Sequence, residues 1–197
     1  MGAQTLPGGV GCVARMSRKR VLIALGVATA ALDAVVLALD HWISKAGGPG
    51  ILGLELSWGR SQAERIMAEW GASGRAAARL SLWIDYAFLL CYGAFFTLAG
   101  LVVRDWARQQ GRRWLAVAGT FVPWFAAAAA AFDACEDALL LLVLAGQGGE
   151  AAPVVASVCA SLKFALIAVA IGYAALGAML WAHSRMRQGG RVFARGR

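Results

Sequence analysis

Residues 21–40 read VLIALGVATAALDAVVLALD, and this stretch decides the fold. It is apolar from end to end apart from one threonine and two acids, Asp33 and Asp40. A run of about 20 apolar residues is the length that an α-helix needs to cross the hydrocarbon core of a bilayer. The stretch therefore predicts a membrane-spanning helix.

Three further apolar stretches, at residues 81–103, 114–145 and 153–183, predict three more spans. The chain of 197 residues is 60% hydrophobic and only 15% charged, whereas soluble domains carry about 25% charged residues. The predicted fold class is an all-α integral membrane protein, a bundle of four transmembrane helices over residues 21–183. The spans leave no room for a separate soluble domain.

Basic residues gather in three segments that a four-span topology places on one side of the membrane. These segments are residues 15–20, 104–113 and 185–197. By the positive-inside rule that side is cytoplasmic. We therefore expect a disordered basic N-terminus over residues 1–20 and a basic tail over 184–197, both cytoplasmic. Because membrane orientation explains the arginines, no nucleic-acid partner is expected.

The first span has a rival interpretation as a signal peptide. Arginines precede an apolar core, and Ala28-Thr29-Ala30 resembles a cleavage site of small residues. The apolar run nevertheless continues to Leu39 and ends beside Trp42, a residue typical of the membrane interface. An uncleaved helix is the favoured interpretation. Met16 offers a second possible start of the chain.

Residues 41–80 form the one long external connection. Gly47-Gly48-Pro49-Gly50 breaks any helix, and the apolar residues that follow are unlike those of a free loop. Ser61-x-x-Glu64 has the spacing of a capping box and predicts a short amphipathic helix that carries Ile66, Met67 and Trp70 and ends at Gly71. Two interpretations stay open: a helix that covers the bundle or lies on the outer interface, and a segment that only connects spans.

Charged residues within the spans are the best indication of a site. Charges in a membrane cost at least about 2.5–3.5 kcal/mol each, so they tend to pair or to face the protein interior. The short turn at residues 146–152 makes the last two spans an antiparallel hairpin. We therefore predict that Lys163 lies within salt-bridge reach of Asp133, Glu136 or Asp137.

The faces of the helices support this convergence. Asp33 shares a stripe with Gly26 and Ala30, and Asp133 shares one with Ala126 and Ala129. Small residues mark the faces on which membrane helices approach one another. We expect these acids to point toward neighbouring helices rather than toward lipid.

The residue types favour acid–base chemistry. Acids crowded at the spacing of Asp133, Glu136 and Asp137 repel one another, so some should hold a proton at neutral pH, as an acid–base enzyme needs. Aromatic faces nearby can stabilise a carbocation. The predicted catalytic residues are Asp33, Asp85, Asp133 and Glu136, and the predicted substrate-binding residues are Trp83, Tyr92, Asp137 and Lys163.

The leading functional hypothesis is a small membrane enzyme that isomerises or cyclises a lipid-like substrate. The alternatives are a non-catalytic partner subunit of a membrane complex and a transport protein for a cation or a small molecule. A buried Lys–Asp pair can also be purely structural. No cofactor is predicted. The spacing of Asp133, Glu136 and Asp137 could hold a divalent cation through oxygen ligands, but Lys163 would compete for the carboxylates, so no metal ligands are assigned.

The expected partners are a membrane lipid or lipid-like molecule, a second copy of the chain, or a membrane partner subunit. Usage rich in Ala, Gly and Arg is typical of bacteria with GC-rich genomes. The expected location is therefore a bacterial inner membrane.

Overall fold

The computed structural model describes residues 9–45 and 47–194, and the side chains of residues 17–45 and 47–186. Within these ranges the chain is helical and contains no strand. In order, the helices are α1 (Gly9–Lys45), α2 (Ile51–Glu55), α3 (Arg60–Gln109), α4 (Arg113–Ala118), α5 (Val122–Leu144) and α6 (Ala151–Ala194).

Four stretches of helix are long and apolar enough to cross a membrane. They are Ser17–Lys45, Arg60–Gln109, Arg113–Leu144 and Ala151–Met186. The prediction of four apolar helices is thereby confirmed. Their length and composition indicate a multi-pass membrane protein.

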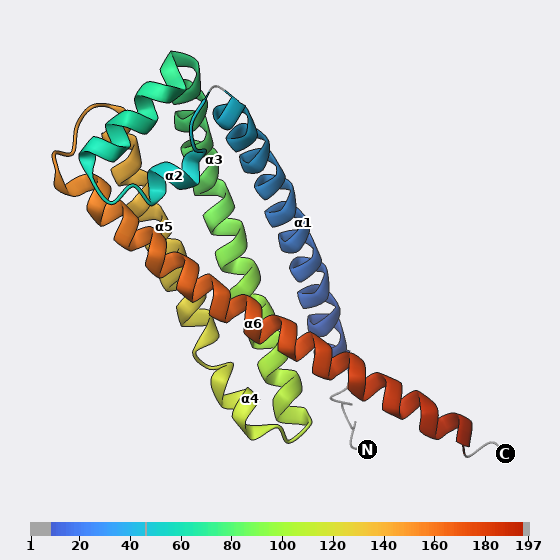
Figure 1. The fold of residues 1–197 in the computed structure, drawn as a ribbon. Helices are drawn as coiled ribbons and strands as arrows, with labels where there is room; N and C mark the ends of the chain where they lie inside the picture. Colours follow the sequence, from blue (N-terminus) through green and yellow to red (C-terminus); the bar gives the residue numbers. More distant parts are fainter. Residues whose placement is uncertain (1–8, 46, 195–197) are drawn as a thin grey trace, which may run out of the picture.

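Helix α3 is the centre of the packing. It contacts α1, α5 and α6, and α5 and α6 pack against each other along an antiparallel hairpin (Figure 1). Helix α1 packs mainly against α3, and none of its most apolar window is buried. The enclosed core is therefore made by α3, α5 and α6, with α1 laid along one side.

A cap covers one end of this core. It consists of α2 and the first turns of α3, which lie beside the turn between α5 and α6 (Figure 1). Ile66 and Trp70 are buried there with Leu140 and Leu144 of α5, and Met67 packs against the same group. The indole Nε1–H of Trp70 donates to the Pro49 carbonyl oxygen at 2.6 Å. The external segment therefore covers the core instead of only connecting spans.

Glycines set the two bends of the cap. Helix α1 ends at Lys45, and Gly47 and Gly48 follow with φ of 115° and 85°, a region that other residues rarely adopt. Gly71 has φ 62° and ψ −163°, and it kinks α3 where the sequence predicted a helix end. The chain becomes helical again immediately afterwards, so the cap helix and the second span form one kinked element.

The third predicted span, residues 114–145, is present but interrupted. It consists of α4 and α5, separated at residues 119–121. Pro123 lies in the first turn of α5 and cannot donate a hydrogen bond back to Gly119, so the helix cannot run through this point. The Tyr173 hydroxyl packs against Gly119 and donates to the Leu115 carbonyl oxygen at 3.0 Å.

The ends of the elements differ from the predictions in three places. Residues 9–20 belong to α1 although they were expected to be disordered, and the expectation for residues 1–8 lies outside the described residues. Helix α6 continues to Ala194, beyond the predicted end at 183. The predicted capping box is wrong, because α3 begins after Gly59 and Ser61 already lies inside its first turn.

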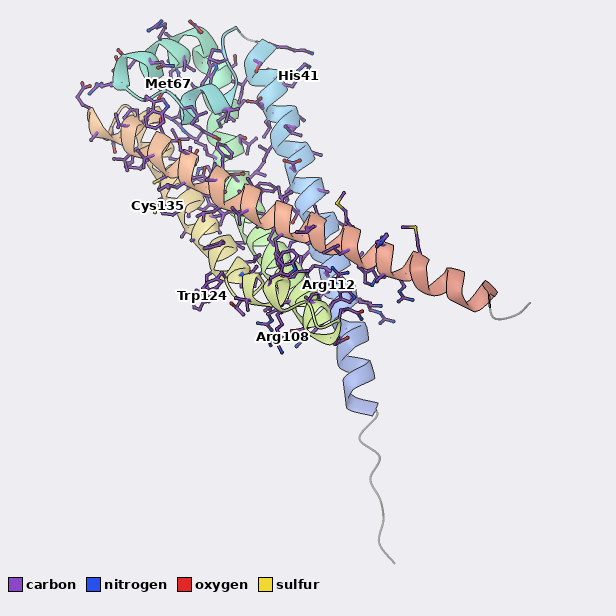
Figure 2. The ribbon with its side chains drawn as sticks, turned by 60° about the horizontal axis from the view of Figure 1, so that its bottom comes forward. His41, Met67, Arg108, Arg112, Trp124 and Cys135 are labelled. Carbon is purple, nitrogen blue, oxygen red and sulfur yellow. The ribbon has the colours of Figure 1, made fainter. Side chains whose placement is uncertain are left out.

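Basic side chains of the first two segments that were predicted to be cytoplasmic lie at the end opposite the cap. Figure 2 shows Arg108 and Arg112 at that end, with His41 and Met67 at the other. Arg18 Nη1 of α1 lies 3.4 Å from Asp105 Oδ2 of α3, which places the beginning of the first span at the same level as the end of the second. Arginines of two of the three predicted segments, 15–20 and 104–113, therefore lie at the same end.

We predict that Trp70→Ala strongly destabilises the protein. Trp70 is 1% exposed, and removing a large buried aromatic side chain costs about 3–5 kcal/mol. Thermal unfolding in detergent should show a clear fall in Tm, whereas Trp83→Ala is the control because Trp83 is 61% exposed. Equal Tm values for the two variants would show that the cap does not stabilise the core.

Candidate functional site

Lys163 of α6 is the centre of a buried group of charges. Its side chain is 5% exposed. The Nζ atom lies 2.6 Å from Asp133 Oδ1 and 2.8 Å from Glu136 Oε2, both on α5. The prediction that Lys163 reaches an acid of the third span is confirmed.

The sequence around these residues lets α5 and α6 approach closely. Ala126 and Ala129 are buried on the face of α5 that carries Asp133, and Ala170 is buried on the face of α6 that carries Lys163. Small side chains bring two helix backbones together. Because the connecting turn is short, Lys163 and Asp133 also lie at the same level.

Tyr92 of α3 supplies a second donor to Asp133. Its hydroxyl donates to Asp133 Oδ2 at 2.9 Å, and the residue is 2% exposed. The two oxygens of Asp133 therefore accept from different helices, Oδ1 from α6 and Oδ2 from α3. This carboxylate joins all three helices of the enclosed core.

Asp85 brings a further carboxyl group from α3. One oxygen from each of Asp85, Asp133 and Asp137 lies within 4.8 Å of the others. Asp133 and Asp137 are almost fully buried, at 2% and 1% exposed, whereas Asp85 is half-buried. The structure thus brings together the predicted residues of the second, third and fourth spans.

Glu55 also belongs to the site, and the sequence analysis missed it. It ends α2, and its Oε2 atom lies 3.8 Å from Lys163 Nζ. Burial raises the pKa of the Glu55 carboxyl above its usual value, and the Lys163 ammonium group opposes this shift. The one signal in the sequence is that Glu55 is the only acid among the apolar residues 51–56. A helix of five residues is too short to show which of its faces is buried.

The acid cluster is defined as the five carboxyl groups that either pair with Lys163 or lie beside its partner Asp133, namely Glu55, Asp85, Asp133, Glu136 and Asp137. Both oxygens of Asp137 and Oε1 of Glu136 are buried and accept no hydrogen bond. Oε2 of Glu136 lies 2.8 Å from Lys163 Nζ, with which it forms an ion pair. Acceptor oxygens are thus in excess over donors at this site.

Three acids or aromatics that were expected at the site or near it lie elsewhere. Asp33 is exposed on α1, and Trp83 is 61% exposed on α3. The expectation that Asp33 points toward neighbouring helices is wrong for this chain, because α1 packs mainly against α3 and Asp33 is exposed. Asp40 has a structural role, since its Oδ1 accepts the Ile51 backbone N–H at 2.5 Å and so caps α2.

No protein-family model, curated protein sequence or solved structure matches this chain. Its class therefore rests on its own features. Four long apolar helices indicate a multi-pass membrane protein, and the acid cluster around Lys163 is its candidate site.

We predict that Lys163→Met is severely destabilising. The substitution leaves Asp133 and Glu136 buried without their cation, and breaking a buried pair costs about 3–5 kcal/mol. Adding Asp133→Asn and Glu136→Gln should restore much of the lost Tm, because the two nearest partners of Lys163 are then uncharged and only Glu55, at 3.8 Å from Nζ in the unchanged protein, keeps its carboxyl group.

Arg60→Met is the matched control, because Arg60 forms an exposed pair with Glu64 at 2.7 Å. Exposed pairs contribute at most about 1 kcal/mol. If Lys163→Met lowered the Tm no more than Arg60→Met does, the buried pairing described above would be contradicted.

Proposed function

We propose that this chain is a multi-pass membrane protein that binds a small cation at the acid cluster and serves in transport of that cation. The observation that carries the proposal is the carboxyl group of Asp137. It is 1% exposed, and neither of its oxygens receives a hydrogen bond. A buried acceptor of this kind is costly unless a proton or another cation satisfies it.

The charges of the cluster support a cation as the ligand. Five carboxyl groups meet one ammonium group, so full ionisation leaves four negative charges without a partner. Such charges are expensive in an apolar interior. Ionisable groups within membrane helices commonly mark ion or proton pathways.

The cap offers a route to the cluster from one end. A hollow on its outer side is lined by Asp40, Leu52, Leu56 and Gln62, among other residues. Helix α2 separates this hollow from the core, since Leu52 borders the hollow while Glu55, on the same helix, reaches Lys163. Passage from the hollow to the acid cluster would require α2 to move.

The lipid-directed enzyme ranks second as a proposal. A lipid-like substrate would have to bring its reacting atom to Asp133 or Glu136, and these residues are 2% and 0% exposed. A small cation needs far less space than a lipid. The aromatic residue Trp83 faces outward and would not line a shared pocket.

We propose that α1 contacts another membrane protein chain. Its most apolar window has no buried residue, and it carries the exposed acid Asp33. Acids within membrane helices usually pair. A second copy of the chain or a membrane partner subunit could supply the missing contact, and assembly would also help four spans to form a path.

The proposed location is the inner membrane of a bacterium, with both ends of the chain in the cytoplasm. The orientation is inferred from the end of the molecule opposite the cap, which carries Arg108 and Arg112 (Figure 2). Basic residues near the ends of spans favour the cytoplasmic side. The cap then faces outward.

We predict cation flux in liposomes that contain the purified full chain. Internal dyes would report entry of H⁺, Na⁺, K⁺, Mg²⁺ or Ca²⁺. Asp137→Asn should slow the flux of the transported cation by about tenfold or more, which corresponds to a loss of about 1.4 kcal/mol. The reason is that the substitution removes the unpartnered carboxylate.

Asp105→Asn is the control, because Asp105 lies at the opposite end, where it pairs with Arg18 and Arg104. It should transport at the rate of the unchanged protein. Absence of flux for all five ions would contradict the transport proposal. Turnover of an added isoprenoid or sterol-like lipid that Asp133→Asn abolishes would favour the enzyme instead.

The orientation is tested by thiol labelling in whole cells. In a background without native cysteines, Gln147→Cys should react with an impermeant reagent, and Gln110→Cys should react only after permeabilisation. Both positions are exposed in turns at opposite ends of the molecule. The reverse pattern would place the cap in the cytoplasm.

A further inference from the structure

Three carboxyl groups of the acid cluster have the arrangement of a metal-ion site. Asp133 and Asp137 are separated by one turn of α5, and Asp85 approaches them from α3. One oxygen atom from each residue lies within 4.8 Å of the other two. In the oxygen shell of Ca²⁺, ligands lie at about 2.3–2.6 Å from the ion. Opposite oxygens are then up to about 5 Å apart, so the three oxygens fit around one ion.

An independent feature points to a missing ligand at this place. Asp137 is 1% exposed, and both of its oxygens lack a donor, although its neighbour Asp133 has two. Lys163 is already engaged by Asp133, Glu136 and Glu55. The carboxyl group of Asp137 therefore needs either a proton, shared with Asp85, or a cation that enters the cluster.

We propose that Asp85, Asp133 and Asp137 together bind one divalent cation of the hard, oxygen-preferring kind, such as Mg²⁺, Ca²⁺ or Mn²⁺. This rests on the proposed function, which it deepens by naming the class of ion. The three ligands are all carboxylates, and carboxylates suit these ions better than the softer metals that prefer thiolate or imidazole. Water molecules would complete the coordination.

Lys163 and the divalent ion can occupy the cluster together. Three carboxylates exceed the charge of a divalent ion by one, and Glu136 and Glu55 remain as partners for Lys163. Asp133 would be shared between Lys163 and the metal ion. Lys163 donates to its Oδ1 atom, and the Tyr92 hydroxyl group donates to Oδ2 and so fixes the orientation of the carboxylate. The ammonium group thus positions a ligand and leaves Asp85 and Asp137 free to bind the metal.

The test uses Mn²⁺ as the probe, because the electron paramagnetic resonance signal of free Mn²⁺ measures its binding directly. The full chain, purified in detergent and freed of metal, should bind one Mn²⁺, and Mg²⁺ or Ca²⁺ should displace it. Asp85→Asn and Asp137→Asn should each weaken binding at least about tenfold, equivalent to about 1.4 kcal/mol. Asp105→Asn is the control and should bind Mn²⁺ like the unchanged protein.

Two variants, Asp85→Asn and Asp137→Asn, are used so that the test remains valid if one of them does not fold. Asp85 is half-buried, so Asp85→Asn is expected to keep its Tm in metal-free buffer even if Asp137→Asn does not. Unchanged Mn²⁺ binding in a folded Asp85→Asn variant would overturn the assignment, as would no Mn²⁺ binding by the unchanged protein.

A parallel titration separates this inference from the proposed function. If Na⁺, K⁺ or protons raised the Tm through Asp137 while Mn²⁺, Mg²⁺ and Ca²⁺ did not, the cation-binding proposal would stand and the divalent site would be wrong. If none of these cations changed the Tm, both would be wrong.

Discussion

An ammonium group cannot stay unpaired inside an apolar group of helices, and Lys163 meets this constraint through Asp133 and Glu136. The contact fixes the level of α6 against α5. Asp133 in turn accepts a hydrogen bond from the Tyr92 hydroxyl group, which ties α3 to the same point. One carboxylate thus sets the relative position of the three helices that enclose the core, and the small residues along their contact faces allow the approach.

The same charge connects the core with the cap. Glu55 ends the five-residue α2 and reaches Lys163, while Asp40 of α1 caps the beginning of that helix. Movement of α2 would therefore displace Glu55 relative to Lys163 in the acid cluster. Helix α2 therefore joins the first span to the acid cluster, through Asp40 at its beginning and Glu55 at its end.

Much of the fold follows from the sequence because length and hydropathy decide whether a helix can span a membrane. The pairing of Lys163 with one of the acids Asp133, Glu136 or Asp137 also follows, since a short turn brings the two helices to the same level. The exposure of Asp33 could not be predicted, because a stripe of small residues does not tell whether a helix has neighbours on one side or on both. Glu55 was missed because five residues are too few to show a helical face, and the break before Pro123 was hidden by a continuous apolar run.

The central claim is that the Lys163 ammonium group is held between carboxylates inside the protein. Solid-state NMR of the chain in lipid bilayers, with ¹⁵N at lysine Nζ and ¹³C at aspartate Cγ, measures this directly. The sequence contains three lysines, Lys19, Lys45 and Lys163, and Lys163 is assigned by its absence from the Lys163→Met, Asp133→Asn, Glu136→Gln variant. The structure predicts a strong ¹⁵N–¹³C dipolar coupling for Lys163, as its 2.6 Å contact with Asp133 requires. A Lys163 signal without that coupling would contradict the account.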